Sequence, residues 1–110
     1  MSEVRNHERR PVALPGNLKT PRSRQAVAVS DLSVTGCKID AIYLSLAAGD
    51  HVTLRPEGLQ ALPANVIWCS GSSAGLLFES PLHPAVLNNL CLQHPHAKDA
   101  MAQSPASSGH

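Results

Sequence analysis

The sequence predicts a mainly β fold: a small six-stranded antiparallel β-barrel with a short C-terminal α-helix. Short apolar segments bounded by Gly, Pro and Ser recur about every ten residues, as in small all-β domains. After Pro81 the apolar period changes to that of a helix. The length of 110 residues suits one domain. Because aromatic residues make up only 3% of the chain, its core must consist mostly of Val, Leu, Ile and Ala.

The first two strands are expected at Val12–Thr20 and Gln25–Ser30. Pro15 and Gly16 interrupt the first of them, so we expect this strand to be kinked or bulged and to lie at a sheet edge. Residues 20–24 are expected to form the loop between the two strands.

Four further strands follow. Cys37–Asp40 and His51–Arg55 alternate apolar with polar residues, as half-buried strands do when successive side chains face opposite sides. The last two strands are expected within Leu59–Cys69, where Ala64, Val66 and Trp68 share a face, and at Ala74–Phe78.

Two connections have recognisable turn chemistry. Arg55–Gly58 has Pro at its second and Gly at its fourth position, which indicates a type I turn. Gly71–Gly75 spells the Gly-x-Ser-x-Gly nucleophile elbow of hydrolases, but that motif requires a strand-to-helix turn over a large parallel sheet. Here it joins two strands, so we do not expect Ser73 to be catalytic.

The predicted helix covers His83–Cys91. Pro84 suits its first helical position, and its apolar stripe consists of Val86, Leu87, Leu90 and Cys91. Three regions therefore result: a flexible basic N-terminal arm at residues 1–11, the barrel with its helix at residues 12–94, and a disordered tail at residues 95–110.

The formal net charge is +1, so bulk electrostatics does not favour nucleic acid or membranes as partners. Residues 1–38 nevertheless hold seven basic and three acidic side chains, a balance of +4, and the remainder carries −3. An anionic ligand should therefore meet the first third. The polar N-terminus lacks a signal peptide, and no run approaches about eighteen apolar residues, so we expect a cytoplasmic protein without membrane insertion.

The cysteines, at positions 37, 69 and 91, are odd in number and widely spaced, so neither a disulfide framework nor a zinc knuckle is expected. They are interpreted as small buried apolar residues. Cys91, His94 and His96 have a loosely metal-like spacing, but a fourth ligand is not evident. No metal or other cofactor is expected.

Two spaced groups of polar residues carry ligand chemistry: Arg5 and Arg9 in the arm, with Arg10 adjacent, and Asp31, Ser33 and Gly36 between the second and third strands. An arginine fork can grip a phosphate or the O6/N7 edge of guanine. Asp31 and Ser33 project to the same side of an extended segment, where they can accept hydrogen bonds from guanine N–H groups. Gly36 permits a tight turn or a close ligand approach. Together the groups complement a guanine nucleotide with more than one phosphate.

In this order, Arg-x-x-x-Arg in an arm and Asp-x-Ser-x-x-Gly between early strands resemble the PilZ domain. The likeness extends from Arg5 to Leu92, and the later Val66–Trp68 and Ala74–Phe78 patterns are similar to the family's closing strands. The resemblance implies a six-stranded barrel that binds cyclic di-GMP (c-di-GMP), often as an intercalated dimer.

The resemblance also implies a role for each motif residue. Arg5 and Arg9 would clasp guanine edges and phosphates, Asp31 and Ser33 would hydrogen-bond a guanine, and Gly36 would keep the loop close. Arg10 is an additional candidate. The expected function is that of a receptor or adaptor, not an enzyme. Ligand binding would order the arm, and the changed surface would regulate a partner protein in motility, adhesion or exopolysaccharide control.

Two other functions are weighed against this one. The first is a PilZ-like protein-interaction module that binds no nucleotide. The second is a small barrel that binds RNA through the basic first third, which the near-zero net charge and scarce aromatic residues disfavour. Trp68 alternates with core positions and is interpreted as buried packing, not as a stacking surface.

Overall fold

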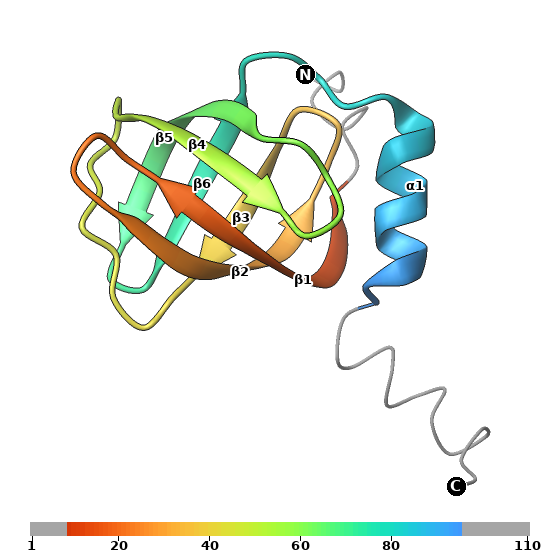
Figure 1. Ribbon diagram of the computed structural model, residues 1–110, viewed down its shortest axis with the longest axis horizontal. Coiled ribbons are helices and arrows are strands. Elements are labelled where there is room, and N and C mark those ends of the chain that lie inside the picture. The colour runs from red at the N-terminus through yellow and green to blue at the C-terminus, as the bar shows by residue number, and fades with distance from the viewer. Residues whose placement is uncertain (1–8, 96–110) are drawn as a thin grey trace, which may run out of the picture.

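The computed structural model describes residues 9–95. Its elements are, in chain order, β1 (Arg10–Lys19), β2 (Arg24–Leu32), β3 (Gly36–Asp40), β4 (His51–Pro56), β5 (Leu62–Ser70), β6 (Ser73–Phe78) and α1 (Pro84–Gln93). All neighbouring strands are antiparallel, and they close a barrel in the order β1-β2-β3-β6-β5-β4 (Figure 1). The predicted six-stranded antiparallel barrel with one C-terminal helix is confirmed.

The barrel core comes from alternate residues of the strands. In β1, Val12, Leu14 and Leu18 are buried while their neighbours Ala13 and Lys19 are exposed. The only buried aromatic side chain of the described residues is that of Phe78, so the core depends on aliphatic packing, as the composition predicted.

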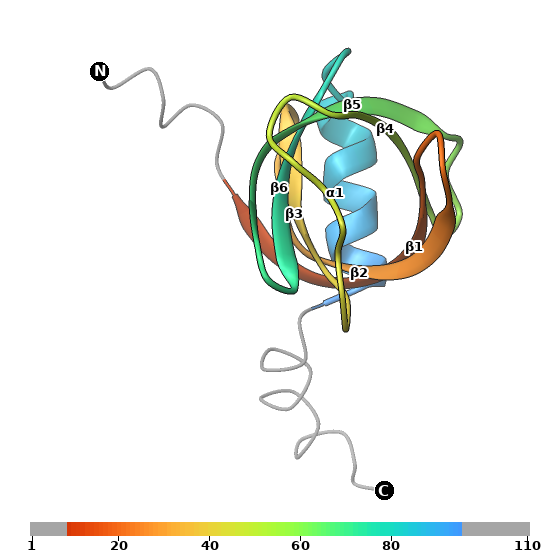
Figure 2. The same ribbon diagram turned by 90° about the vertical axis from the view of Figure 1, so that its left-hand side faces the viewer.

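Helix α1 covers one end of the barrel. Figure 2 looks along the barrel and shows α1 crossing its far end. The helix begins at Pro84, as predicted, and Leu87, Leu90 and Cys91 are its buried residues. The Nδ1 atom of His83 accepts a hydrogen bond from the Ala85 amide at 3.0 Å, which caps one of the free amides of the first turn.

The expectation that the first strand lies at a sheet edge is wrong. β1 pairs with β2 on one side and with β4 on the other, and closing the barrel removes exposed edges. The register shift lies between Pro11 and Leu14, not at Pro15. Pro15 is accommodated because the ladder to β4 begins at Gly16, so the missing amide of Pro15 removes no hydrogen bond from it.

The turn after β4 also differs from its prediction. Pro56 is the last residue of β4, and the Leu59 amide donates to the Pro56 carbonyl at 3.1 Å, so the turn spans residues 56–59. Gly58, at the third position, has a φ of +82°. A positive φ there is typical of a type II turn and not of the expected type I turn.

β5 and β6 are joined by a two-residue hairpin turn. Gly71 has a φ of +60° and Ser70 lies opposite Ser73, which is the geometry of a type II′ turn. The Ser73 hydroxyl donates a hydrogen bond to the Asp40 carboxylate. The Gly-x-Ser-x-Gly pattern therefore lies on a hairpin between two strands, as predicted.

A bulge in β5 reverses the expected direction of Trp68. Ala64 and Val66 are buried as predicted, but the register shifts between Val66 and Trp68. The extra residue turns Trp68 to the outer surface, where the residue is 37% exposed. The prediction of a buried Trp68 is wrong for this reason.

Candidate functional site

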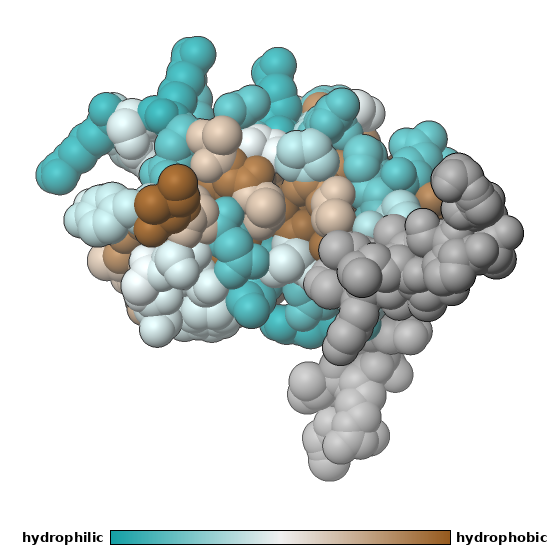
Figure 3. All heavy atoms as spheres, turned by 90° about the horizontal axis from the view of Figure 1, so that it is seen from below, coloured by the Kyte–Doolittle hydropathy of each residue, from teal (hydrophilic) through white to brown (hydrophobic). Residues whose placement is uncertain are grey.

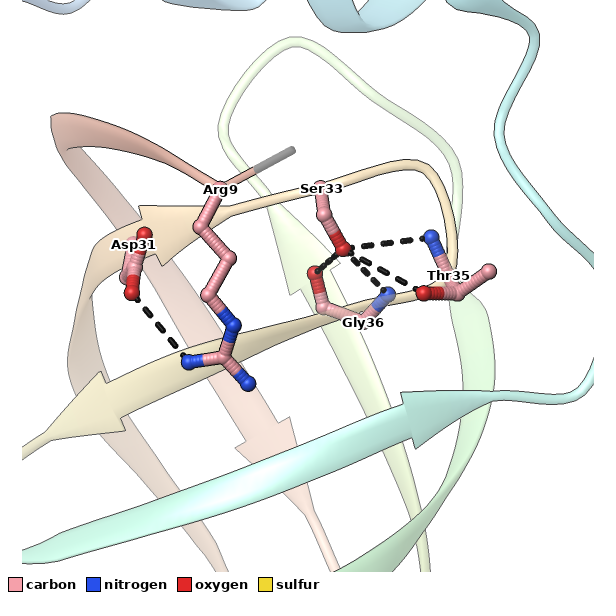
Figure 4. A network of polar contacts seen from close by, with 5 residues as sticks. All are labelled: Arg9, Asp31, Ser33, Thr35 and Gly36. Carbon is pink, nitrogen blue, oxygen red and sulfur yellow. Dashed lines mark hydrogen bonds and ion pairs between the residues drawn. The ribbon is translucent and has the colours of Figure 1, made fainter. Parts of the chain in front are cut away.

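Arg9 and Asp31 meet at the start of the barrel wall. The β1–β2 register pairs Pro11 with Asp31, which brings Arg9 beside the end of β2. The Nη1 atom of Arg9 donates to Oδ2 of Asp31 at 3.3 Å (Figure 4). The Arg9 side chain is 55% exposed and that of Asp31 27% exposed, so water screens the pair and it contributes little stability. Both charged groups therefore remain accessible to a ligand.

Ser33 lies inside the turn between β2 and β3. Its side chain is buried, and its Oγ atom accepts hydrogen bonds from the Thr35 amide at 3.3 Å and the Gly36 amide at 3.2 Å. Figure 4 shows the Ser33 hydroxyl directed at Thr35 and Gly36, while the Asp31 carboxylate meets the Arg9 guanidinium. The structure thus brings Asp31 and Ser33 close in the chain but gives their side chains different partners.

Gly36 is required by the close packing of β3 against β6. It is buried opposite Leu77, and a Cβ atom at residue 36 would overlap the carbonyl oxygen of Leu76. The Leu76 carbonyl belongs to the backbone and cannot rotate away as a side chain could, so a larger residue at position 36 would force β3 and β6 apart. Gly36 therefore fixes the spacing of two strands.

Arg10 is directed away from Asp31. Its Nη1 atom donates to Oδ1 of Asn88 on α1 at 3.2 Å. The Ala13 amide also donates to the His94 carbonyl at 2.9 Å, so the start of β1 is fastened to the helix in two places. The structure does not bring Arg10 to the other candidate residues, and Arg5 lies outside the described residues.

A row of outward-facing residues extends from Asp31 across the barrel wall. The register pairs Asp31 with Lys38, Lys38 with Gly75, and Gly75 with Trp68. With about 4.8 Å between neighbouring strands, this row spans about 14 Å. We call these four residues, on β2, β3, β6 and β5, the wall row.

Trp68 lies against Gly75 at the far end of the wall row. A Cβ atom at residue 75 would overlap the indole ring, so the absence of a side chain there makes room for it. Exposed Ile67 and Leu77 lie on the same two strands. Sequence reasoning missed Lys38 and Trp68; the alternation in Cys37–Asp40 indicates that Lys38 faces outward, but nothing in the sequence reveals the bulge before Trp68.

Two titratable groups lie beneath or beside this wall. Burial raises the pKa of the Cys37 thiol to about 12; the charge of Asp31 adds to this shift and that of Arg9 opposes it. Burial alone would raise the pKa of the Asp40 carboxyl, but the neighbouring Ser30 and Ser73 hydroxyls and the charge of Lys38 outweigh it and lower the pKa. Cys37 therefore stays protonated, and Asp40 stays ionised.

Comparison with known protein families matches residues 3–93 to the PilZ domain. The chain belongs to the PilZ family. PilZ domains are a non-catalytic receptor family whose members typically bind c-di-GMP. The resemblance found in the sequence is thereby confirmed. Comparison with curated proteins gave no match.

The described residues contain no candidate metal site. Within residues 9–95, no group of three or more His, Cys, Asp or Glu side chains could hold a metal ion, and His96 lies outside this range. All three cysteines are free; Cys37 and Cys91 are buried and Cys69 is partly buried. No helix in the described part of this PilZ chain is long and apolar enough to cross a membrane.

Substituting Gly36 tests its structural role. Gly36→Ala is expected to lower the free energy of unfolding by about 1–3 kcal/mol, because the new methyl group collides with the β6 backbone. Urea denaturation followed by circular dichroism measures this. An unchanged unfolding midpoint would contradict the close approach of β3 and β6.

The lowered pKa of Asp40 predicts a pH dependence. A carboxyl whose folded pKa lies below its ordinary value of 3.8 stabilises the fold fully above that value, and this contribution is lost as the pH falls towards the folded pKa. Asp40→Asn should therefore unfold less steeply with acid below about pH 4 than the parent chain. Denaturation midpoints between pH 2 and pH 6 check this, and Glu57→Gln, at an exposed position of the turn after β4, serves as the control. Parallel curves for the parent and Asp40→Asn would refute it.

Proposed function

We propose that this PilZ chain is a c-di-GMP receptor whose ligand binds along the wall row, starting at the accessible Arg9–Asp31 pair. The exposed ion pair at the end of the row is the observation that carries the proposal. Guanine presents acceptors at O6 and N7 and N–H donors on another edge, which match a guanidinium and a carboxylate respectively. One arginine and one aspartate side by side can therefore read both kinds of edge.

Ligand binding would exchange partners at this pair. In the free chain the Asp31 carboxylate accepts from Arg9 at 3.3 Å. A guanine N–H edge can replace Arg9 at Asp31, and the released guanidinium can then grip a phosphate or the guanine O6/N7 edge with two parallel hydrogen bonds. The family resemblance assigns Arg5, the other arginine of the Arg-x-x-x-Arg motif, to the same ligand.

Ser33 and Gly36 would serve as positioning residues for Asp31. The Ser33 hydroxyl is already used by the Thr35 and Gly36 amides, and Gly36 sets the distance between β3 and β6. Both hold the end of β2 in place, which keeps the carboxylate two residues away aimed outward. Their contribution to binding would therefore be indirect.

The far end of the wall row suits the rest of a cyclic dinucleotide. Lys38 lies between Asp31 and Gly75, where an ammonium group can neutralise phosphate. Trp68 is 37% exposed and offers an indole on which a guanine can stack. The row thus supplies a base-edge contact, a cation and a stacking surface within about 14 Å.

The response to the ligand would pass through the arm. Arg9, which meets Asp31, is followed directly by Arg10, which bonds Asn88 of α1. A movement of Arg9 towards the ligand would therefore pull on the strand end that is bonded to the helix. The changed surface would regulate a partner protein in the cytoplasm, in motility, adhesion or exopolysaccharide control.

An interaction module that binds no nucleotide is the second candidate function. The observation in its favour is that Arg9 and Asp31 satisfy each other, and Ser33 satisfies its own turn, without any ligand. Calorimetry with c-di-GMP, GMP, GTP and a short RNA separates the candidates. A binding heat for c-di-GMP but not for GMP, GTP or RNA supports the receptor. The absence of a binding heat for all four ligands supports the interaction module.

Replacing Arg9 tests the ligand site. Arg9→Ala should weaken c-di-GMP binding by about 1–3 kcal/mol, because a bidentate arginine contact is lost. Arg22→Ala removes an equal charge from the loop between β1 and β2, away from the wall row, and should bind almost as the parent does. Isothermal titration calorimetry measures both; equal losses would indicate diffuse electrostatic attraction instead of a site.

Replacing Trp68 tests the far end of the wall row. Trp68→Ala should weaken c-di-GMP binding by about 1–3 kcal/mol if a base stacks on the indole, and Ile67→Ala, an exposed neighbour, should have little effect. Because Trp68 is the only tryptophan of the chain, its fluorescence in the parent should also change during the titration. An emission spectrum that stays constant at saturating ligand would exclude stacking.

A further inference from the structure

Three cations share one outward face at the end of the barrel wall where the β1–β2 hairpin turns. The register places Lys19 directly opposite Arg24 on β2 and opposite Thr53 on β4, and it places Asn17 opposite Arg55. Lys19, Arg24 and Arg55 are all exposed. On adjacent strands, directly opposite and diagonal residues lie close enough for their side chains to interact. We call these three residues the cationic cluster.

The cationic cluster is unfavourable for the free protein. Like charges directly opposite each other on paired strands repel, and Lys19 and Arg24 are such a pair. Within residues 9–95 the ion pairs are Arg9–Asp31 and His51–Glu79, so no carboxylate lies within ion-pair distance of the cluster. A ligand that carries several negative charges would relieve this repulsion.

The cationic cluster lines a hollow of about 480 Å³, together with Asn17 and Thr53. A volume of this size is within the range of small-molecule sites. The amide of Asn17 and the hydroxyl of Thr53 add neutral donors between the charged groups. The hollow thus combines positive charge, hydrogen-bond donors and concavity.

We propose that this hollow is a second binding site, for a small molecule that carries two or more linked phosphoryl groups. Two guanidinium forks can each hold phosphate oxygens in pairs, and the Lys19 ammonium adds a point charge. A single carboxylate would leave most of the repulsion in place, whereas a di- or triphosphate neutralises all three cations.

The surroundings of the hollow disfavour a nucleic-acid strand as the occupant. Seen from below, the surface over β1 and β2 shows apolar area in its middle and hydrophilic side chains around it (Figure 3). Ala13, Pro15, Ala26 and Ala28 are exposed residues of these strands. These exposed apolar residues separate the cationic cluster from Arg9 at the other end of β1, so a long backbone of phosphates would find no continuous basic track between them.

The hollow is separate from the c-di-GMP site. The Arg9–Asp31 pair lies at the beginning of β1 and Lys19 at its end, and a strand of this length extends about 30 Å. The proposal therefore does not depend on the wall row and survives if c-di-GMP does not bind there.

Titration of the full chain with sodium tripolyphosphate, followed through its backbone amide NMR signals, tests the proposal. Saturable shifts are expected at Asn17, Lys19, Arg24, Thr53 and Arg55. Arg24→Gln and Arg55→Gln should each weaken binding about tenfold or more, because each loses a charge-assisted contact. Arg22→Gln, which removes the same charge from outside the hollow, should bind as the parent does.

Three results would overturn the proposal. The first is the absence of saturable shifts at physiological salt. The second is an equal loss of affinity in Arg22→Gln, which would indicate diffuse attraction. The third is tighter binding of a short single-stranded DNA than of tripolyphosphate at the same amides. All substituted residues are exposed, so each variant is expected to fold. The dispersion of its remaining amide signals checks this.

Discussion

The register of the closed barrel is the constraint on which both proposed sites depend. In a closed barrel every outward residue has fixed neighbours on two other strands, so Asp31, Lys38, Gly75 and Trp68 are adjacent although they come from four strands. A slip of one residue in any strand would turn its side chains to the opposite face. The aliphatic core opposes such a slip, because it would expose fully buried residues such as Ile39. The ligand chemistry of the surface is thus held in place by the packing beneath it.

In the proposed site, the Asp-x-Ser-x-x-Gly segment would serve both the ligand and the fold. Asp31 faces the solvent and meets Arg9, whereas Ser33 holds the turn and Gly36 lets β3 approach β6. In the proposed complex these two residues would need no rearrangement, because their contacts already exist in the free chain. Arg9 differs from them: its exposed partnership with Asp31 is weak enough to be exchanged. The proposed site is therefore fixed by the fold at Ser33 and Gly36, whereas the contact of Arg9 can be exchanged.

Local patterns predicted the strands and the helix because alternation and helical spacing depend only on which residues face the core. Features that depend on one extra or one shifted residue were not predictable in this way. The bulge before Trp68 reverses its direction, and the strand that begins at Arg10 sends Arg9 and Arg10 to different partners. The bonds of the Ser33 hydroxyl to its own turn are common local chemistry for a serine before a glycine. The same pattern also suits a ligand contact, so the sequence alone does not decide between the two.

The most direct test of the account is to observe which atoms of this PilZ domain contact c-di-GMP. Nuclear Overhauser effects between the guanine H8 protons and side chains of the ¹³C-labelled full chain report such contacts without any substitution. The account predicts effects to the Trp68 indole and the Lys38 methylenes, with the Asp31 and Arg9 signals shifting together. Effects confined to the β3–β4 loop or the hairpin end, with the wall row unchanged, would contradict it.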